Sequence, residues 1–460
     1  MTHYRNRYLV LLRSLIWLLA ILYFASSFIG CACLNKIFET KESQGVPQIP
    51  PPNQVNLQLA SHVDEVQIKK AFSAAVTPNI PINLINVRSC PCDTSLINVS
   101  LPSSYTIIIK GAEGPLAVKP PAGATGGDVD LTFSNVLAGS NFRVSPLIDF
   151  KTQAEREREP GRTIDTAGKV PTKTVSVAVF DTGLQPDYLP GTSWQQATQQ
   201  CLILGPSSQI GWNFTSEGNA KNTNDMSSMK HGSRVANLIA RQFNSSPILV
   251  KIVPMKVLTS SLEGDLFGLL CAMETARKNK IAVFNMSLGY YGVEDSLFKA
   301  YVARATNDSI KLVVASGNRS VGDSIAKINR NFSKMTPLFY PAAFGINSNQ
   351  IFVATTAHMS SGRLLSCGRQ NYGDSLVMGV LEDQDCRFVF MSPSAGTNPS
   401  LIVGSSYATP VLAGWLARKI VEKPNSNLVR QLLPVWMTPA SHGTELYKNA
   451  YIKSMPPMVF

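Results

Sequence analysis

Three short motifs each place a residue suited to nucleophilic catalysis beside glycine or another small residue. Asp181 begins Asp-Thr-Gly, His231 begins His-Gly-Ser, and Ser406 lies in the sequence GSSYATP of residues 404–410. A serine hydroxyl is a weak nucleophile that needs a neighbouring base, and a histidine held by a carboxylate can take its proton. The three residues therefore predict attack of Ser406 on a carbonyl carbon, with His231 as general base and Asp181 orienting the imidazole.

A fourth motif supplies a group that could stabilise the charge formed in such an attack. Asn318 ends the sequence ASGN, and its amide and the backbone N–H of Ser406 are candidate donors to the oxyanion of a tetrahedral intermediate. The sequence VLAGWLARKIV after Pro410 has a helical pattern. Ser406 would then lie at a helix N-terminus, where the helix dipole also favours negative charge.

Each of these residues also has a structural explanation when it is taken alone. An aspartate in DTG can close a turn or cap a helix, Ser406 can cap the helix that follows it, and Asn318 can be a turn residue. His231 is harder to explain in this way, because the chain has 5 histidines and only this one precedes Gly-Ser. The order Asp, His, Ser, together with Asn318, favours catalysis.

A fifth motif, NMSLG at residues 285–289, completes a pattern that resembles the subtilisin family of serine peptidases. The motifs of that family have the forms DTG, HGTxVA and GTSMAxP and occur in the same chain order. The resemblance covers residues 175–417. It implies an α/β fold, a subtilisin-like three-layer domain with a mostly parallel sheet. An aspartic peptidase would need two catalytic Asp motifs, and the sequence has only a single one, at Asp181.

The resemblance also assigns an activity and further residues. It implies a serine endopeptidase that hydrolyses peptide bonds through an acyl-enzyme, with Asn318 serving the oxyanion. The segment whose backbone would pair with an extended substrate consists of Ser287, Leu288 and Gly289.

Some positions depart from the family pattern. Tyr407 replaces the methionine beside the nucleophile, and Arg234 stands where a histidine is common. Tyr290 and Tyr291 follow Gly289, where the family more often has small residues. We expect these two tyrosines to narrow or reshape the substrate cleft.

The sequence around the motifs has the pattern of a fold that could bring them together. Apolar, β-branched runs such as TVSVAVF, KIAVFNMSL and IKLVVAS alternate with helical patterns such as DLFGLLCAMETARKNK and EDSLFKAYVARAT. Strands without a polar face need helices on both sides, as in a parallel sheet. Asp181 and Asn318 each follow one of these strands, which places them at the carboxyl edge where such sheets carry their sites.

The chain is long enough for more than one domain. It has 460 residues, of which 44% are hydrophobic and 16% charged, so it can bury a core and is not a disordered chain. We divide it into a signal peptide with a candidate lipobox (1–33), a linker (34–54), an N-terminal domain (55–150), a linker or processing segment (151–174) and a peptidase domain (175–460). The N-terminal domain has a small α/β or β-rich pattern. The sequence leaves open whether it is a propeptide or a retained binding domain.

The first segment predicts export. Arg5, Arg7 and Arg13 precede an uncharged run at residues 14–32, which is long enough for a signal peptide or a single membrane anchor. The sequence FIGC, which ends at Cys31, resembles a bacterial lipobox, in which the cysteine is lipidated after cleavage. We favour this reading over an ordinary signal peptide, so we expect an extracytoplasmic protein anchored through Cys31 on the bacterial cell surface or in the periplasm.

The remaining features predict protein or peptide substrates and no required cofactor. The net charge is +12 without a clustered basic stripe, which argues against nucleic acid as a partner. Cys90 and Cys92 have no second pair at zinc spacing, and Cys271 lies in an apolar helical pattern that suits a core position. Structural calcium is implied by the family resemblance only, because no acidic ligand loop matches.

Two other function classes stay open at this stage. The peptidase fold could bind peptides without cleaving them, as a pseudopeptidase. Alternatively, the protein could be a surface lipoprotein whose main function is peptide binding by its N-terminal domain. The complete set of motifs favours the peptidase.

Overall fold

The computed structural model of the chain describes residues 50–453 with gaps, of which the longest are 122–128, 147–172, 190–211, 319–331, 391–399 and 423–450. All described residues belong to one compact unit, Gln44–Phe460. The predicted signal peptide and the lipidation site Cys31 lie outside the described residues. Within the described part of the chain, no helix combines the length and the apolar character that crossing a membrane requires.

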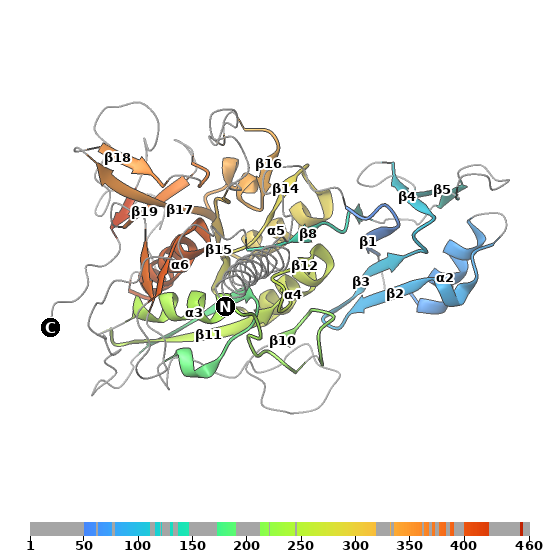
Figure 1. Cartoon of the computed structure of the whole chain (residues 1–460). Coiled ribbons are helices and arrows are strands. Elements are labelled where there is room, and N and C mark those ends of the chain that lie inside the picture. The colour runs from blue at the N-terminus through green and yellow to red at the C-terminus, as the bar shows by residue number, and fades with distance from the viewer. Residues whose placement is uncertain are drawn as a thin grey trace, which may run out of the picture. The chain divides into compact units, whose positions relative to one another are not determined.

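The described residues before 147 form mainly antiparallel sheet (Figure 1). Four strands pair in the order β2-β3-β1-β7, and three others in the order β4-β5-β6. Helix α2 presents Ile68 and Phe72, one turn apart, to a core that includes Val55 and Leu57 of β1. The elements are β1 (Gln54–Gln58), α2 (Glu65–Ala74), β2 (Asn86–Cys90), β3 (Asp93–Ser100), β4 (Thr106–Ile109), β5 (Leu116–Lys119), β6 (Val129–Leu131), β7 (Leu137–Gly139) and β8 (Arg143–Val144).

The second part is built on a nine-stranded sheet in the order β10-β11-β9-β13-β15-β17-β19-β22, with β18 paired to β17. Neighbouring strands along this order run parallel, and only β18 runs antiparallel to its partner. The strands are β9 (Lys173–Asp181), β10 (Trp212–Asn213), β11 (Ile248–Lys256), β13 (Val283–Met286), β15 (Lys311–Ala315), β17 (Ile351–Ser360), β18 (Arg363–Ser366), β19 (Val377–Glu382) and β22 (Tyr451–Lys453).

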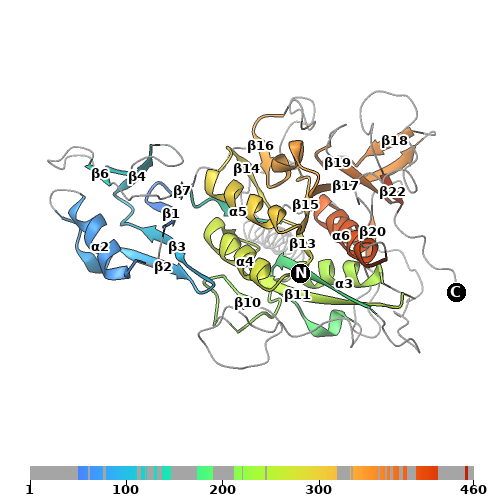
Figure 2. The same cartoon turned by 180° about the vertical axis from the view of Figure 1, so that it is seen from behind.

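Strand β9 shows why this sheet needs a helical layer on each face. Val175, Val177 and Val179 belong to the core cluster that includes α3 and α6, whereas Ala178 and Phe180 belong to the cluster of α4 and α5. Alternate residues of a strand point to opposite faces, so both faces of β9 are apolar and buried. Figure 2 shows the same layers from behind. The helices are α3 (His231–Arg241), α4 (Leu266–Lys278), α5 (Ser296–Asn307) and α6 (Ser405–Glu422).

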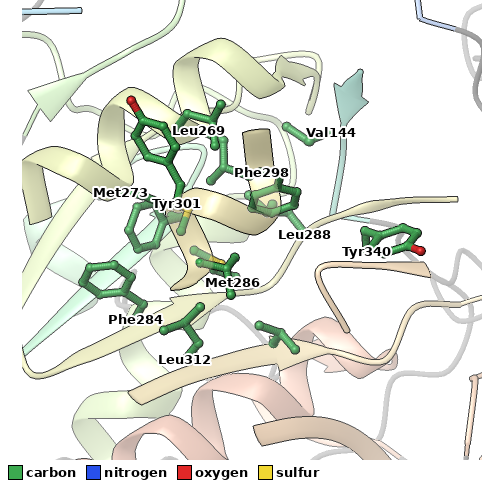
Figure 3. Packing of buried hydrophobic residues seen from close by; sticks show 14 of the residues in the cluster. Val144, Leu269, Met273, Phe284, Met286, Leu288, Phe298, Tyr301, Leu312 and Tyr340 are labelled. Carbon is green, nitrogen blue, oxygen red and sulfur yellow. The ribbon is translucent and has the colours of Figure 1, made fainter. Parts of the chain in front are cut away.

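Figure 3 shows the packing on the α4 and α5 face. Leu269 of α4 and Phe298 of α5 lie in one buried cluster with Phe284 and Met286 of β13. Val144 of β8 is part of the same cluster, so the N-terminal part of the chain contributes to the core of the second part.

Five short strands and three short helices complete the described structure. β12 (Gly264–Asp265) pairs with β8, β14 (Tyr290–Gly292) with β16 (Leu338–Tyr340), and β20 (Phe388–Phe390) with β21 (Ser400–Ile402). The 3-10 helices are Ile82–Leu84, Pro186–Tyr188 and Ala342–Asn347. The predicted fold class is confirmed: a three-layer α/β domain with a mostly parallel sheet, preceded in the chain by a small β-rich region.

Candidate active site

Asp181 and His231 meet at the carboxyl edge of the sheet. Asp181 is the last residue of β9 and His231 the first residue of α3, and neither side chain is exposed to solvent. The Nδ1 atom of His231 lies 2.7 Å from Oδ1 and 2.9 Å from Oδ2 of Asp181. Asp181 is further fixed by the backbone N–H of Thr182, which donates to Oδ1 at 2.7 Å. The carboxylate therefore sets the orientation of the imidazole, and Nδ1 is the nitrogen that carries its proton toward Asp181.

The start of α3 is held by residues outside the His-Gly-Ser motif. Asp225, which is fully buried, accepts hydrogen bonds through Oδ2 from the backbone N–H of Ser233 at 3.0 Å and from its hydroxyl at 2.8 Å. A carboxylate at this place satisfies backbone donors that a helix leaves unpaired at its N-terminus. Gly232 is also required here, because a Cβ atom on it would lie 2.2 Å from the carbonyl oxygen of Gly183. These contacts fix the position of His231.

Ser406 is the second residue of α6, and a proline in the helix shapes its surroundings. Pro410 is four residues further on and has no N–H to donate to the carbonyl of Ser406. That carbonyl instead accepts the hydroxyl of Ser287 at 2.8 Å. The missing N–H of Pro410 thus frees a carbonyl that ties the nucleophile segment to Ser287.

Asn318 lies beside the start of α6. Its Oδ1 atom accepts the backbone N–H of Ser405 at 3.1 Å, and the hydroxyl of Ser405 accepts the N–H of Gly317 at 3.1 Å. Gly317 has φ of +91°, a conformation that strongly favours glycine. The strand end after β15 and the first turn of α6 are therefore joined in two places, and the Asn318 amide lies next to the nucleophile segment.

The segment 287–289 divides into two roles. Ser287 supports Ser406, and Leu288 is fully buried in the core. Gly289 pairs with Ser145 as in an antiparallel ladder: each backbone N–H donates to the other's carbonyl, at 3.1 and 3.0 Å. Gly289 thus binds an extended segment of the N-terminal part of the chain.

That extended segment continues to the nucleophile. β8 pairs with β12, with Val144 opposite Gly264, so residues 143–145 are paired on both sides. The next residue, Pro146, accepts a hydrogen bond of 2.6 Å from the Ser406 hydroxyl through its backbone oxygen. Among the described residues, the Nε2 atom of His231 is buried without a hydrogen-bond partner. A peptide therefore lies across the site with a carbonyl group on Ser406.

The two tyrosines after Gly289 have different surroundings. The ring of Tyr290 stacks on Phe142 with centroids 4.3 Å apart, next to the extended segment. Tyr291 lies behind the site: its hydroxyl donates to the carbonyl of Asn318 at 3.0 Å and accepts from Asn371 at 2.6 Å. Tyr290 therefore packs beside the extended segment, whereas Tyr291 supports Asn318. That these tyrosines reshape the substrate cleft stays a prediction.

Tyr407 contributes an apolar wall rather than a charge. Its ring centroid lies 5.2 Å from that of His231, and burial raises the pKa of Tyr407 to about 12. The phenol therefore stays neutral beside the imidazole.

All seven residues assigned to catalysis and substrate binding from the sequence lie at this edge of the sheet. Sequence reasoning missed Asp225, Asn371 and the segment 143–146, none of which stands in a recognisable motif. Within the described ranges, the structure has no group of three or more His, Cys, Asp or Glu side chains that could hold a metal ion.

The fold and the site define a class of protein: a three-layer α/β protein with an Asp-His pair and a serine at the carboxyl edge of a parallel sheet. The family model of the subtilase family, Peptidase S8, matches residues 172–454. The chain belongs to the subtilase family.

Individual relatives are distant. Subtilisin DY of Bacillus licheniformis is 29% identical over 149 residues, which is 31% of this chain and 47% of the relative. Subtilisin Savinase of Lederbergia lenta is 28% identical over 272 residues, covering 57% of this chain and 78% of the relative. An alkaline protease of Alkalihalobacillus alcalophilus is also 28% identical over 272 residues, and 55% of its length is covered. This chain thus spans about half of the length of two of these relatives.

Proposed function

We propose that the protein is a serine endopeptidase whose catalytic residues are Asp181, His231 and Ser406, with Asn318 as an oxyanion donor. One observation carries the proposal. The Pro146 carbonyl accepts a hydrogen bond from the Ser406 hydroxyl at 2.6 Å while the preceding residues are paired on both sides as an extended strand. This is how a peptide substrate must lie for a serine to reach its backbone.

In the proposed reaction, the Ser406 oxygen attacks the carbonyl carbon of the scissile peptide and passes its proton to Nε2 of His231. Asp181, at 2.7 Å from Nδ1, stabilises the imidazolium that results. The oxyanion accepts from the Nδ2 amide of Asn318 and from the backbone N–H of Ser406. The imidazolium then protonates the leaving amine, and water hydrolyses the acyl-enzyme by the same steps.

We further propose that the N-terminal domain (55–150), which the structure describes up to residue 146, acts as a propeptide that blocks the cleft. Its last described residues occupy the place of a substrate. Val144 is completely buried in the core of the peptidase part, so the segment is anchored as well as paired. The alternative of a retained binding domain gains nothing from this contact, because it would leave a peptidase with an obstructed site.

Export and anchoring complete the proposal. The apolar run at residues 14–32 and the sequence FIGC ending at Cys31 support a lipoprotein outside the cytoplasm. Because a single acyl chain holds a protein on a membrane only weakly, stable attachment at Cys31 would take more than one chain. Mass spectrometry of the N-terminal peptide from membranes, with Cys31→Ser as the control, tests this part.

Labelling with a fluorophosphonate probe tests the catalytic assignment. The full-length chain is treated before a cut within residues 147–172 and again after the cut and removal of the N-terminal domain, alongside Ser406→Ala, and the modified residue is located by mass spectrometry. We expect label on Ser406 after the cut domain has been removed, and none in the variant. Absence of label from the opened chain would contradict the peptidase assignment and favour a protein that binds peptides without cleaving them.

A further inference from the structure

A disulfide joins the N-terminal domain to the peptidase domain. Cys90 ends β2, Cys271 lies in α4, and the Cα atoms of the bonded pair are 5.5 Å apart. The two cysteines are 181 residues apart in the chain, on either side of residues 147–172. A cut anywhere in that stretch therefore produces two fragments that are still held by a covalent bond.

Polar contacts also join the N-terminal domain to helices α4 and α5. Asp265 caps α4 by accepting the N–H of Gly268 through Oδ1 at 2.7 Å, and its Oδ2 atom pairs with Arg88 at 2.5 Å. Asp295 caps α5 in the same way through Oδ1, and its Oδ2 atom accepts the backbone N–H of Ser140 at 2.7 Å. Each of the two helix-capping aspartates thus uses one oxygen for its own helix and the other for the N-terminal domain.

A third contact lies on the side of α5. The hydroxyl of Tyr301 donates to Asp93 at 2.9 Å, and Arg304 lies 3.7 Å from the same carboxylate. Arg88 adds a cation–π contact, with its guanidinium carbon 4.6 Å from the centroid of the Phe267 ring. The N-terminal domain is thus held along both helices, and not only by the segment in the cleft.

The disulfide itself is protected. Cys90 is 0% exposed and Cys271 is 2% exposed. Thiol–disulfide exchange requires a thiolate to reach one of the sulfur atoms. While the domains are packed together, an external thiol reaches these sulfur atoms only when the N-terminal domain transiently moves away, so reduction is slow and the bond outlasts a cut in the connecting stretch.

We propose that the disulfide Cys90–Cys271 retains the N-terminal domain on the peptidase after the connection is cut, so that proteolysis alone does not open the cleft and reduction of this bond is the step that does. The retention follows from the covalent bond alone, whereas its effect on activity rests on the proposed peptidase function. A linked domain keeps an effective concentration of the order of millimolar beside its binding site. In a dilute solution the unlinked domain has no such advantage.

The opening step is a two-electron reduction by a dithiol. The sulfurs of the dithiol become joined as a disulfide, and Cys90 and Cys271 each receive one electron and one proton and become thiols. Dithiothreitol serves as the probe.

The first arm of the test measures retention without using the activity. A recognition site for a sequence-specific protease is inserted between residues 158 and 159 of the full-length Ser406→Ala chain, which is then cut and unfolded without reductant. Intact mass spectrometry should find one species with the mass of both fragments together, and dithiothreitol should split it into two. Two separate fragments before reduction would overturn the proposal.

The second arm measures activity in the same insertion chain with Ser406 present, using a fluorescent casein at nanomolar enzyme. We expect the cut chain to turn over at least about tenfold faster after reduction, because the unlinked domain dissociates. Cys90→Ser should reach this rate after cutting without reductant, which separates the effect from that of the other disulfide, at Cys367. Cys92→Ser is the matched control and should behave as the unaltered chain.

The outcomes separate the two proposals. A cut, oxidised chain that is already as active as the reduced chain overturns the gating role of the disulfide. If the mass measurement finds the oxidised fragments linked but no form of the chain, reduced or oxidised, turns over casein, the peptidase function is contradicted and the gating with it. If Cys90→Ser fails to fold, the mass measurement still tests retention, and turnover of the cut insertion chain before and after reduction still tests the gating.

Discussion

The catalytic edge of the sheet and the face formed by α4 and α5 hold their partners by different means. At the catalytic edge, Asp181, His231 and Ser406 are at most 2% exposed and are positioned by short motifs that end strands or begin helices. At the helical face, single residues far apart in the sequence contact the N-terminal domain. The Arg88 and Asp265 side chains there keep 34% and 29% of their surface exposed.

This difference predicts where each region is sensitive. Buried groups that act together fail together, so a single change at the catalytic edge removes almost all of the function. Partly exposed pairs are screened by water and contribute little one at a time. The disulfide is the exception on the helical face, since it is buried and covalent.

The largest effect is expected from His231→Ala. The Ser406 hydroxyl would lose its base, and in subtilisin such a change lowers kcat by about 10⁶. Turnover of casein by the cut and reduced chain measures it, and the thermal unfolding temperature checks that the fold is kept. Retention of more than about a thousandth of the rate would mean that His231 is not the base.

A smaller loss at the same edge is expected from Asn318→Ala. Removal of one oxyanion donor costs about 10²–10³ in kcat, again on the scale of subtilisin. The change should leave KM nearly unaltered, because the donor acts on charge that forms only in the transition state. Asn318→Asp is the matched variant, since it keeps the size of the side chain and removes the donor. If either variant had the kcat of the unaltered chain, the assignment of Asn318 would be contradicted.

The same contrast explains what the sequence could predict. The strands, the helices and the catalytic motifs are local patterns: β9 ends at Asp181 and α6 begins beside Ser406, as their residues suggest. The carboxyl ends of neighbouring parallel strands then bring such motifs together without further information.

The contacts of the N-terminal domain could not be predicted in this way. Cys271 has the apolar surroundings of a core residue, and nothing in its neighbourhood points to Cys90. Asp265 and Asp295 look like ordinary helix caps, and their second oxygens find partners only in the folded chain. The sequence placed Tyr290 and Tyr291 in the cleft together, yet only the structure distinguishes the one that stacks on Phe142 from the one that supports Asn318.

On the helical face, Asp295 should make stability depend on pH. Burial raises its pKa to about 6, so the folded chain binds this proton more tightly than the unfolded chain does. The resulting stabilisation is complete below the usual pKa of about 3.9 and is lost as the pH rises through about 6, by at most about 3 kcal/mol.

Denaturant unfolding between pH 4 and 7 measures this effect as the difference between the unaltered chain and Asp295→Asn. Asparagine also caps helices, so the variant should keep α5 while losing this part of the slope. Parallel curves for the two chains would show that Asp295 does not titrate in this range.

The smallest effect is expected from the pair Arg88 and Asp265. Because both side chains are partly exposed, a double-mutant cycle with Arg88→Ala and Asp265→Asn should give a coupling energy of about 1 kcal/mol or less, falling with added salt. The readout is the dissociation rate of the N-terminal domain from cut Cys90→Ser chains, where the disulfide no longer masks the contact. A coupling several times larger would mean that the helical face depends on this ion pair as the catalytic edge depends on its buried residues, and that the disulfide is less needed for retention than we infer.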